Sequence, residues 1–184
     1  IDVLIKDRFL SLKKIFIMAL KENCILNQTE INNKIRRIAF QIYECNIDEQ
    51  EVVIAGIYSN GYLFAQKIKS VLLKISNINP LLCKVEINKN KPTNPITTSI
   101  SPNDYQGKSL VLVDDVLNSG TTLIYGVKHF LDVPLKQFKT AVLVNRNHKK
   151  YPVKADFKGI SLSTSLNEHV NVIFNEKNSK VVLG

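Results

Sequence analysis

The chain alternates short runs of apolar, β-branched residues with stretches in which apolar residues recur at helical spacing. One helix is predicted to begin after Asn27, because Glu30 completes a capping box and apolar residues then recur every three or four positions as far as Ile42. Further helices are predicted at residues 62–74 and 121–131. This alternation is typical of an α/β fold, in which a parallel β-sheet is flanked by helices.

Short apolar runs predict the strands of this sheet. They fall at residues 52–57, 82–87, 110–113, 141–144, 170–174 and 181–183. Residues 88–108 carry prolines and many Asn, Thr and Ser side chains without periodicity, so a long loop is expected there, and loops of this length often act as lids. We expect one domain at residues 25–184, preceded by an extension at residues 1–24 whose role the pattern does not define.

Composition narrows the class of protein. A chain of 184 residues with 45% hydrophobic residues is long enough to bury the core of one globular domain. Its cysteines lie far apart without metal-ligand spacing, which favours reduced thiols and a cytoplasmic protein. The longest apolar run near the start, at residues 15–20, is too short to cross a bilayer, so we expect no membrane partner.

Positive charge is in excess, with 25 Lys and Arg residues against 16 Asp and Glu residues and a formal net charge of +9. Such a balance suits nucleic acid, a phosphorylated substrate or an anionic surface, but a solvated basic surface has the same composition. The basic residues cluster in two segments, which could form one face. They are Lys34, Arg36 and Arg37 in one segment and Arg146, His148, Lys149, Lys150, Lys154 and Lys158 in the other.

The segment LVLVDDVLNSGTTL, residues 110–123, carries the clearest chemistry. Its aliphatic strand delivers Asp114 and Asp115 to the carboxyl edge of a parallel sheet, where ligands of open α/β folds bind. The small residues from Asn118 to Thr122 form a cradle of backbone amides and hydroxyls for one phosphate at a helix N-terminus. Carboxylates repel phosphate but accept hydrogen bonds from sugar hydroxyls or bind a metal ion, so a site for ribose 5-phosphate is predicted.

The same segment allows two other interpretations. Two surface aspartates before an ordinary helix cap would carry no ligand at all. A nucleoside triphosphatase would need a phosphate loop that ends in Lys and Ser or Thr, but Tyr62 and Leu63 follow the glycines at 56 and 61. The absent lysine argues against this second interpretation.

Residues 111–122, VLVDDVLNSGTT, resemble the phosphoribosyl diphosphate motif of type I phosphoribosyltransferases. Residues 141–172, AVLVNRNHKKYPVKADFKGISLSTSLNEHVNV, are similar to the region after that motif in the PyrR family of pyrimidine operon regulators. Residues 25–46 resemble the first helix of the same family. The resemblance covers residues 25–184 and implies the type I phosphoribosyltransferase fold.

The resemblance also implies a function. Members of this family transfer ribose 5-phosphate from phosphoribosyl diphosphate to uracil, and some bind pyrimidine-operon messenger RNA. It implies Mg²⁺ on the diphosphate, with no direct protein ligand for the metal, and a homodimer or larger homo-oligomer. A pyrimidine base or nucleotide and possible RNA are therefore the expected partners.

The resemblance assigns roles residue by residue. Asp114 and Asp115 are implied to be catalytic, and the implied phosphoribosyl-binding residues are Val116, Leu117, Asn118, Ser119, Gly120, Thr121 and Thr122. The implied pyrophosphate loop consists of Tyr58, Ser59, Asn60 and Gly61. The implied base-binding residues are Asn145, Arg146, Asp156 and Phe157. The implied RNA contacts are Arg36, Arg37, Arg146, His148, Lys149 and Lys154.

Several positions depart from the family pattern. The pyrophosphate loop GIYSNG carries Tyr58 and Asn60 where the family has lysine and arginine, and KNKP at residues 89–92 replaces another charged element. Each cation removed from a pyrophosphate site could cost about 2–4 kcal/mol of transition-state stabilisation. Lys89 and Lys91 could restore charge from other positions. A catalytically weakened sensor of nucleotides or phosphoribosyl diphosphate that binds RNA is therefore the alternative function, and Asn145, in place of an aspartate, leaves the base preference open.

Overall fold

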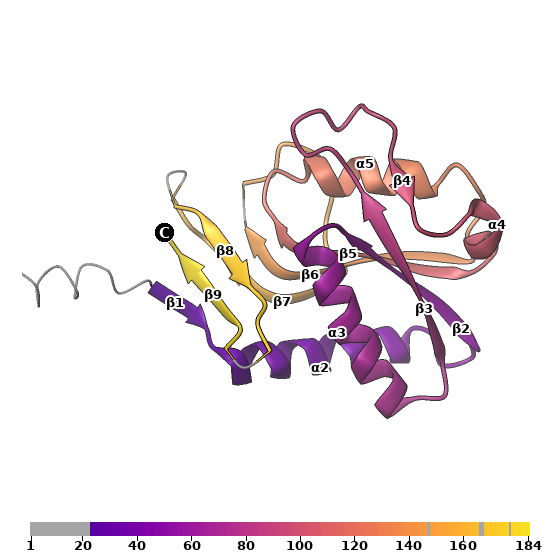
Figure 1. Ribbon diagram of the computed structural model, residues 1–184, viewed down its shortest axis with the longest axis horizontal. Helices are drawn as coiled ribbons and strands as arrows, with labels where there is room; N and C mark the ends of the chain where they lie inside the picture. The colour runs from indigo at the N-terminus through magenta and orange to yellow at the C-terminus, as the bar shows by residue number, and fades with distance from the viewer. Residues whose placement is uncertain (1–22, 147, 166–167, 177) are drawn as a thin grey trace, which may run out of the picture.

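The computed structural model describes residues 23–146, 148–165, 168–176 and 178–184, which form two β-sheets and four helices (Figure 1). The larger sheet has six strands in the order β4-β3-β2-β5-β6-β7. Its strands are β2 (Glu51–Ile57), β3 (Asn79–Glu86), β4 (Thr97–Thr98), β5 (Ser109–Leu117), β6 (Gln137–Arg146) and β7 (Phe157–Leu162). All neighbours pair in parallel except β3 and β4, which confirms the predicted parallel α/β sheet.

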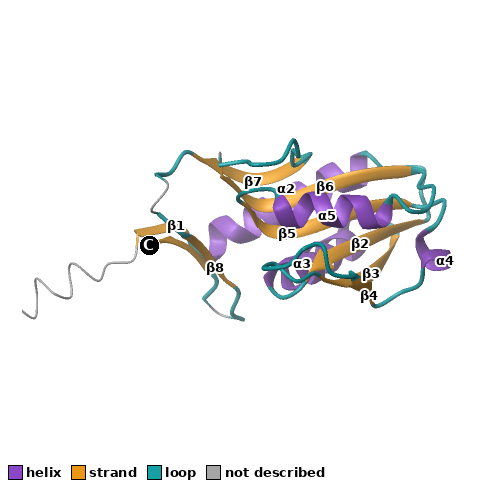
Figure 2. Cartoon of the chain, turned by 90° about the horizontal axis from the view of Figure 1, so that it is seen from above, coloured by secondary structure: helices purple, strands orange, loops and turns teal. Residues whose placement is uncertain are grey.

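A separate three-stranded antiparallel sheet has the order β1-β9-β8. It consists of β1 (Asn23–Leu26), β8 (Val170–Ile173) and β9 (Lys180–Leu183). Both views place this sheet beside the larger one, at the opposite end from β4 (Figures 1 and 2). The strands predicted at residues 170–174 and 181–183 therefore belong to this second sheet. The unpredicted β1 begins inside the expected extension, and residues 1–22 lie outside the described part.

The helices cover both faces of the larger sheet. They are α2 (Gln28–Glu44), α3 (Asn60–Ile75), α4 (Pro102–Tyr105) and α5 (Thr121–Phe130). The predicted capping box of α2 is present, because Glu30 N donates to Asn27 Oδ1 at 3.0 Å and Asn27 N donates to Glu30 Oε2 at 2.9 Å. Helices α2 and α3 lie on one face, and α5 lies on the other (Figure 1).

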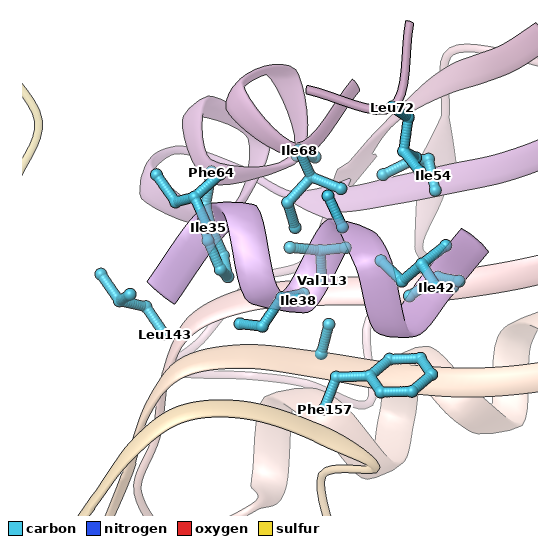
Figure 3. Packing of buried hydrophobic residues seen from close by; sticks show 14 of the residues in the cluster. Ile35, Ile38, Ile42, Ile54, Phe64, Ile68, Leu72, Val113, Leu143 and Phe157 are labelled. Atoms are coloured by element: carbon cyan, nitrogen blue, oxygen red, sulfur yellow. The ribbon is translucent and has the colours of Figure 1, made fainter. Parts of the chain in front are cut away.

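The core beneath α2 and α3 explains the helical periodicity of the sequence. Ile35, Ile38 and Ile42 point from α2 into a cluster that also contains Val113 of β5 and Phe157 of β7 (Figure 3). Full burial of each such side chain contributes about 1.5–3 kcal/mol relative to an exposed one. This packing fixes the position of β5, the strand that carries the two aspartates.

The structure adds elements that the periodicity did not predict. Strand β7 was missed because Lys158 and Ser161 are polar and the run is interrupted by a glycine. The expected loop at residues 88–108 contains β4 and the single-turn α4, whose N-terminus has Asp104 accepting hydrogen bonds from Ser101 N and Oγ. Strand β5 runs four residues beyond its predicted end at Val113, since its pairing with β6 continues to Leu117.

Candidate active site

Strand β5 brings two adjacent carboxylates to the carboxyl end of the parallel sheet. Asp114 is only 5% exposed, whereas Asp115 is partly exposed, and as strand neighbours they point to opposite faces. The backbone N–H of Asp115 donates to Asp114 Oδ1 at 3.0 Å. Burial, and secondly the negative charge of Asp115, raise the pKa of Asp114 well above its ordinary value. Asp114 therefore retains a proton more readily than an exposed aspartate does.

The expected pyrophosphate loop, residues 58–61, lies directly against this acidic pair. It connects β2 to α3, and the peptide bond between Tyr58 and Ser59 is cis. A Cβ built on Gly61 would lie 2.9 Å from Asp114 Cα and 2.8 Å from Val113 O, so only glycine allows this approach. The fold thus brings this loop and the two carboxylates together.

Asn60, the first residue of α3, connects the loop to both sheets. Its Nδ2 donates to Asp115 Oδ2 at 3.1 Å and to the backbone oxygen of Val172 in β8 at 2.9 Å. One amide group thereby contacts a site carboxylate and the three-stranded sheet. The sequence placed Asn60 in the implied pyrophosphate loop, at a position where the family has a cation, and did not predict these contacts.

The expected phosphoribosyl loop forms a small pocket at the start of α5. Its volume is about 50 Å³. The lining residues are Asp114, Val116, Leu117, Asn118, Ser119, Gly120, Thr122 and Leu123. Gly120 has φ of 79°, and a Cβ there would lie 2.5 Å from Val153 Cγ1, so this turn requires glycine.

Hydroxyl groups and the neighbouring chain fix the shape of this phosphoribosyl loop. Ser119 Oγ lies 2.9 Å from Thr121 Oγ1, and Thr121 N donates to Ser119 Oγ at 3.3 Å. The backbone oxygen of Ser119 accepts from Lys150 N at 2.8 Å and from Tyr151 N at 3.3 Å. Amides at the beginning of α5 and these hydroxyls form the kind of cradle that binds an anion.

Asn145 and Arg146, expected at the base, end strand β6. Asn145 pairs with Leu117, beside the phosphoribosyl loop, and its Nδ2 donates to Ser161 Oγ at 3.3 Å. Its Oδ1 is buried and has no hydrogen-bond partner among the described residues. Arg146 is only 4% exposed, and its guanidinium donates to Thr164 Oγ1 and to the backbone oxygens of Ser165 and Glu168. Arg146 therefore holds the segment after β7 in place.

Asp156 and Phe157 are not brought to the acidic pair. The Phe157 ring packs in the core beneath α2, facing Ile42 (Figure 3). The Asp156 carboxylate accepts from Thr140 N at 2.9 Å and from Thr140 Oγ1 at 3.0 Å, in the first half of β6. In this arrangement both side chains serve the packing and the connection of β6 to β7, and neither faces the ligand-binding edge.

The residues expected at RNA divide between two places. Arg37 of α2 donates to the backbone oxygens of Lys158 and Gly159, both at 2.7 Å, so the basic segments of α2 and β7 do meet. Arg36 lies over the Phe40 ring at 5.7 Å.

The second group of residues expected at RNA lies near the phosphoribosyl loop. It comprises His148, whose Nε2 lies 2.7 Å from Thr164 O, and the exposed Lys149. Lys154 is exposed, and its backbone oxygen accepts from Thr140 Oγ1.

A cation not identified from the sequence lies next to the pyrophosphate loop. Lys84 Nζ is 5.4 Å from the centre of the Tyr58 ring and 2.7 Å from Glu86 Oε1. Hydrogen bonding to Glu86 raises the pKa of Lys84. Tyr58 and Glu86 also line a pocket of about 480 Å³ with residues of the following loop. The alternation of Lys84 and Glu86 at the end of a predicted strand was the available signal.

The described part of the chain contains neither a cluster of metal-ligating side chains nor a helix that could cross a membrane. Its His, Cys, Asp and Glu residues form no group of three or more that could hold a metal ion. The acidic pair offers two carboxylates, of which Asp114 is buried beside Asp115. Within the same residues, no helix has the length and apolar character needed to cross a membrane.

Comparison with known proteins identifies the family. Residues 23–176 match the family described as phosphoribosyl transferase domain. The chain belongs to the phosphoribosyltransferases. It is 33% identical over 173 residues to the bifunctional protein PyrR of Fusobacterium nucleatum, covering 89% of this chain and 97% of that protein. It is 32% identical to the bifunctional protein PyrR of Chloroflexus aurantiacus, covering 84% and 90% of the two chains.

Solved structures of other phosphoribosyltransferases have the same fold. Hypoxanthine phosphoribosyltransferase of Trypanosoma cruzi in complex with the product IMP superposes with a TM-score of 0.72 at 16% identity, covering 89% of this chain and 95% of that chain. A hypoxanthine-guanine phosphoribosyltransferase of Bacillus anthracis gives a TM-score of 0.69 at 16% identity, covering 88% and 98%. The expected type I phosphoribosyltransferase fold is confirmed.

Proposed function

We propose that this phosphoribosyltransferase transfers ribose 5-phosphate from phosphoribosyl diphosphate to a pyrimidine base, with uracil as the preferred acceptor. A ring nitrogen of the base loses its proton to solvent and forms the new bond to C1 of the ribose, while the bond from C1 to the pyrophosphate oxygen breaks and pyrophosphate leaves. The observation that carries this proposal is the meeting of three parts at one sheet edge: the acidic pair, the loop at residues 58–61 and the phosphoribosyl loop. Similarity to proteins named PyrR supports a pyrimidine acceptor.

The acidic pair suits the ribose. Asp115 accepts from Asn60 through Oδ2 and leaves Oδ1 for a ribose hydroxyl. Asp114 lines the phosphoribosyl pocket and supplies a second acceptor on the other face of the strand. Positive charge develops on the ribose ring as the bond to pyrophosphate breaks, and nearby carboxylates stabilise that charge. The cradle from Asn118 to Thr122 holds the 5-phosphate.

The leaving group requires positive charge and hydrogen-bond donors. Mg²⁺ carried by the diphosphate would neutralise part of its charge, and Asp114 and Asp115 are chemically suited to contact such an ion or its water ligands. Ser59 and the amides at the start of α3 supply donors. Lys84 beside Tyr58 supplies a cation from the neighbouring strand, in place of a charged residue within the loop.

The base is assigned to the edge near Asn145. Its amide group offers one donor and one acceptor, which matches the N3–H and O4 edge of uracil. The partnerless Oδ1 supports this role, because a buried acceptor without a partner is costly until a ligand satisfies it. Rotation of the side chain away from Ser161 would present both groups to the base.

A second candidate function is regulation through RNA. The similarity to proteins named bifunctional, together with the meeting of the α2 and β7 basic segments, favours it. Arg36 and Lys158 are exposed there and suit RNA phosphates, as does the exposed Lys154, whereas the buried Arg146 does not. We also propose a homodimer in the cytoplasm, where the free thiols of Cys24, Cys45 and Cys83 would stay reduced.

The two functions are separated by two assays on the same purified chain. Phosphoribosyl diphosphate, Mg²⁺ and a panel of bases are scored for pyrophosphate release, with uracil expected to give the highest rate. Filter binding to a pyrimidine-operon leader RNA and to a scrambled RNA measures the regulatory function. Turnover without RNA discrimination supports the transferase alone, and RNA discrimination without turnover supports the regulator.

A further inference from the structure

We propose that Asn60 is a positioning residue that holds the Asp115 carboxylate in the orientation needed for ribose and connects it to the three-stranded sheet. This role rests on the proposed function, because it concerns the ribose-binding carboxylate of the same site. It also assigns Asn60 a role different from that of the cation that the resembling family carries at this position. The side chain is a neutral double donor placed between two acceptors.

The geometry defines what Asn60 does. Asp115 Oδ2 and the backbone oxygen of Val172 are both acceptors, and the two N–H bonds of the Asn60 amide satisfy them at 3.1 and 2.9 Å. Asn60 belongs to the first turn of α3, which is rigidly seated because Gly61 packs on Asp114. A hydrogen bond from helix α3, rather than one from water, therefore holds the Asp115 carboxylate.

Charge explains why an amide fits this position. An aspartate at position 60 would face a carboxylate and a carbonyl oxygen and would repel both. An arginine, which the resembling family carries at this position, would bring a positive charge next to Asp115. The amide donates to both without adding charge, so Asp115 keeps its full negative charge for the ribose.

A purely structural role is the competing explanation, and the chain offers a matched control for it. Phe174, which follows β8, stacks on Phe64 of α3 with ring centres 6.2 Å apart. Lys67 Nζ lies 5.6 Å from the centre of the same Phe174 ring. These contacts also connect the second sheet to α3, yet no contact between Phe174 and Asp115 is found among the described residues. Phe174→Leu therefore weakens the packing of the three-stranded sheet on α3 but leaves the hydrogen bond to the Asp115 carboxylate in place.

The test is a double-mutant cycle on the affinity for uridine monophosphate, measured by calorimetry. Asn60→Ala is expected to weaken binding about tenfold. Asp115→Asn is expected to weaken it further, and the double variant should match Asp115→Asn alone, because Asn60 acts through Asp115. Asn60→Ser, which retains one donor, should lie between wild type and Asn60→Ala and serves if the alanine variant does not fold.

Melting temperature separates positioning from structural support. Asn60→Ala and Phe174→Leu should both lower it, but only Asn60→Ala should weaken nucleotide binding. Equal nucleotide affinities for these two variants, or additive effects of Asn60→Ala and Asp115→Asn, would overturn the positioning role while the function stands. Failure of the wild-type chain to bind uridine monophosphate would instead overturn the proposed function, and the role of Asn60 with it.

Discussion

The ammonium group of Lys84 lies over the ring of Tyr58, 5.4 Å from the ring centre, at the entrance to the pyrophosphate loop. Position 58 is where the resembling family carries a lysine, and here a strand residue brings the positive charge to the same place. Such a cation–π contact orients the lysine over the ring. Lys84 is also paired with Glu86 at 2.7 Å, so it acts on the diphosphate as part of an ion pair.

The first prediction concerns this lysine. Lys84→Met should raise the Michaelis constant for phosphoribosyl diphosphate about threefold to tenfold, because the diphosphate loses a nearby cation. Steady-state kinetics of pyrophosphate release measures the change. Lys74→Met, at the last turn of α3, removes the same charge at the far end of that helix and should have no effect. Equal effects of both substitutions would assign Lys84 to general electrostatics only.

The second prediction restores a cation within the loop. Tyr58→Lys should increase uracil phosphoribosyltransferase activity, by up to the roughly 2–4 kcal/mol that one transition-state donor supplies. Asn60→Arg, the other substitution suggested by the sequence, should instead reduce activity because it removes the hydrogen bonds to Asp115 and Val172. Turnover numbers of the two single variants, measured side by side, test this difference. An increase in both variants would contradict the structural role of Asn60.

The third prediction concerns the ribose hydroxyls. Asp114→Asn together with Asp115→Asn should weaken the binding of uridine monophosphate, since hydrogen bonds to charged acceptors contribute about 1.5–3 kcal/mol each. Calorimetry with the nucleotide measures the loss. Deoxyuridine monophosphate provides the control, because it lacks one hydroxyl and should lose less affinity in the double variant. Unchanged affinity for uridine monophosphate would remove the acidic pair from the ribose site.

The fourth prediction is a pH dependence of stability set by Asp114. Its pKa in the folded chain is raised by burial and by Asp115, so below the unfolded-state value near 3.9 both states are protonated and nothing is lost. As the pH rises, the unfolded chain ionises first, and stability falls until the folded-state pKa is passed. The Asp114→Asn variant has no carboxyl group at this position and should not show this pH-dependent decrease in the free energy of unfolding. Its melting temperature should exceed that of wild type by a margin that grows as the pH rises above the unfolded-state pKa of Asp114 and levels off above the folded-state pKa, and a margin independent of pH would contradict the assignment.

The fifth prediction separates the basic residues. Arg146→Ala should destabilise the chain by about 1–3 kcal/mol, because it removes a buried guanidinium and its hydrogen bonds to partly buried acceptors at Thr164 and Glu168. Arg36→Ala and Lys158→Ala should leave stability unchanged but each reduce the salt dependence of RNA binding by about 0.7–0.9 in the log–log slope. Thermal melts and filter-binding titrations measure the two effects. An unchanged salt slope in both surface variants would place any RNA contact elsewhere.

Much of the fold follows from local patterns. The capping box at Asn27 and the apolar stripe ending at Ile42 predicted α2, and the aliphatic run before Asp114 predicted β5. Helix α2 is set by interactions within its segment and by one buried face, whereas β5 is an apolar run buried on both faces, and a sequence records both patterns directly. The association of Asp114, Asp115 and the following small residues at a sheet edge was predictable for the same reason.

Other features depend on contacts between distant segments. Phe157 resembled a base-contacting residue, but the position of β7 beneath α2 buries its ring in the core. Arg146 was expected to contact the base and RNA, but its guanidinium is buried and donates to Thr164 Oγ1 and to the backbone oxygen of Glu168. The two contacts of Asn60 span 55 and 112 residues along the chain, so no local pattern could reveal them.

The measurement that tests the central claim most directly is release of pyrophosphate from phosphoribosyl diphosphate in the presence of Mg²⁺ and uracil. The structure predicts uracil-dependent release with stoichiometric formation of uridine monophosphate, and its loss in the Asp114→Asn, Asp115→Asn variant. Cytosine and hypoxanthine, assayed in parallel, should give lower rates. No base-dependent release by the wild-type chain, although it binds uridine monophosphate, would contradict the transferase assignment and leave a nucleotide-binding regulator.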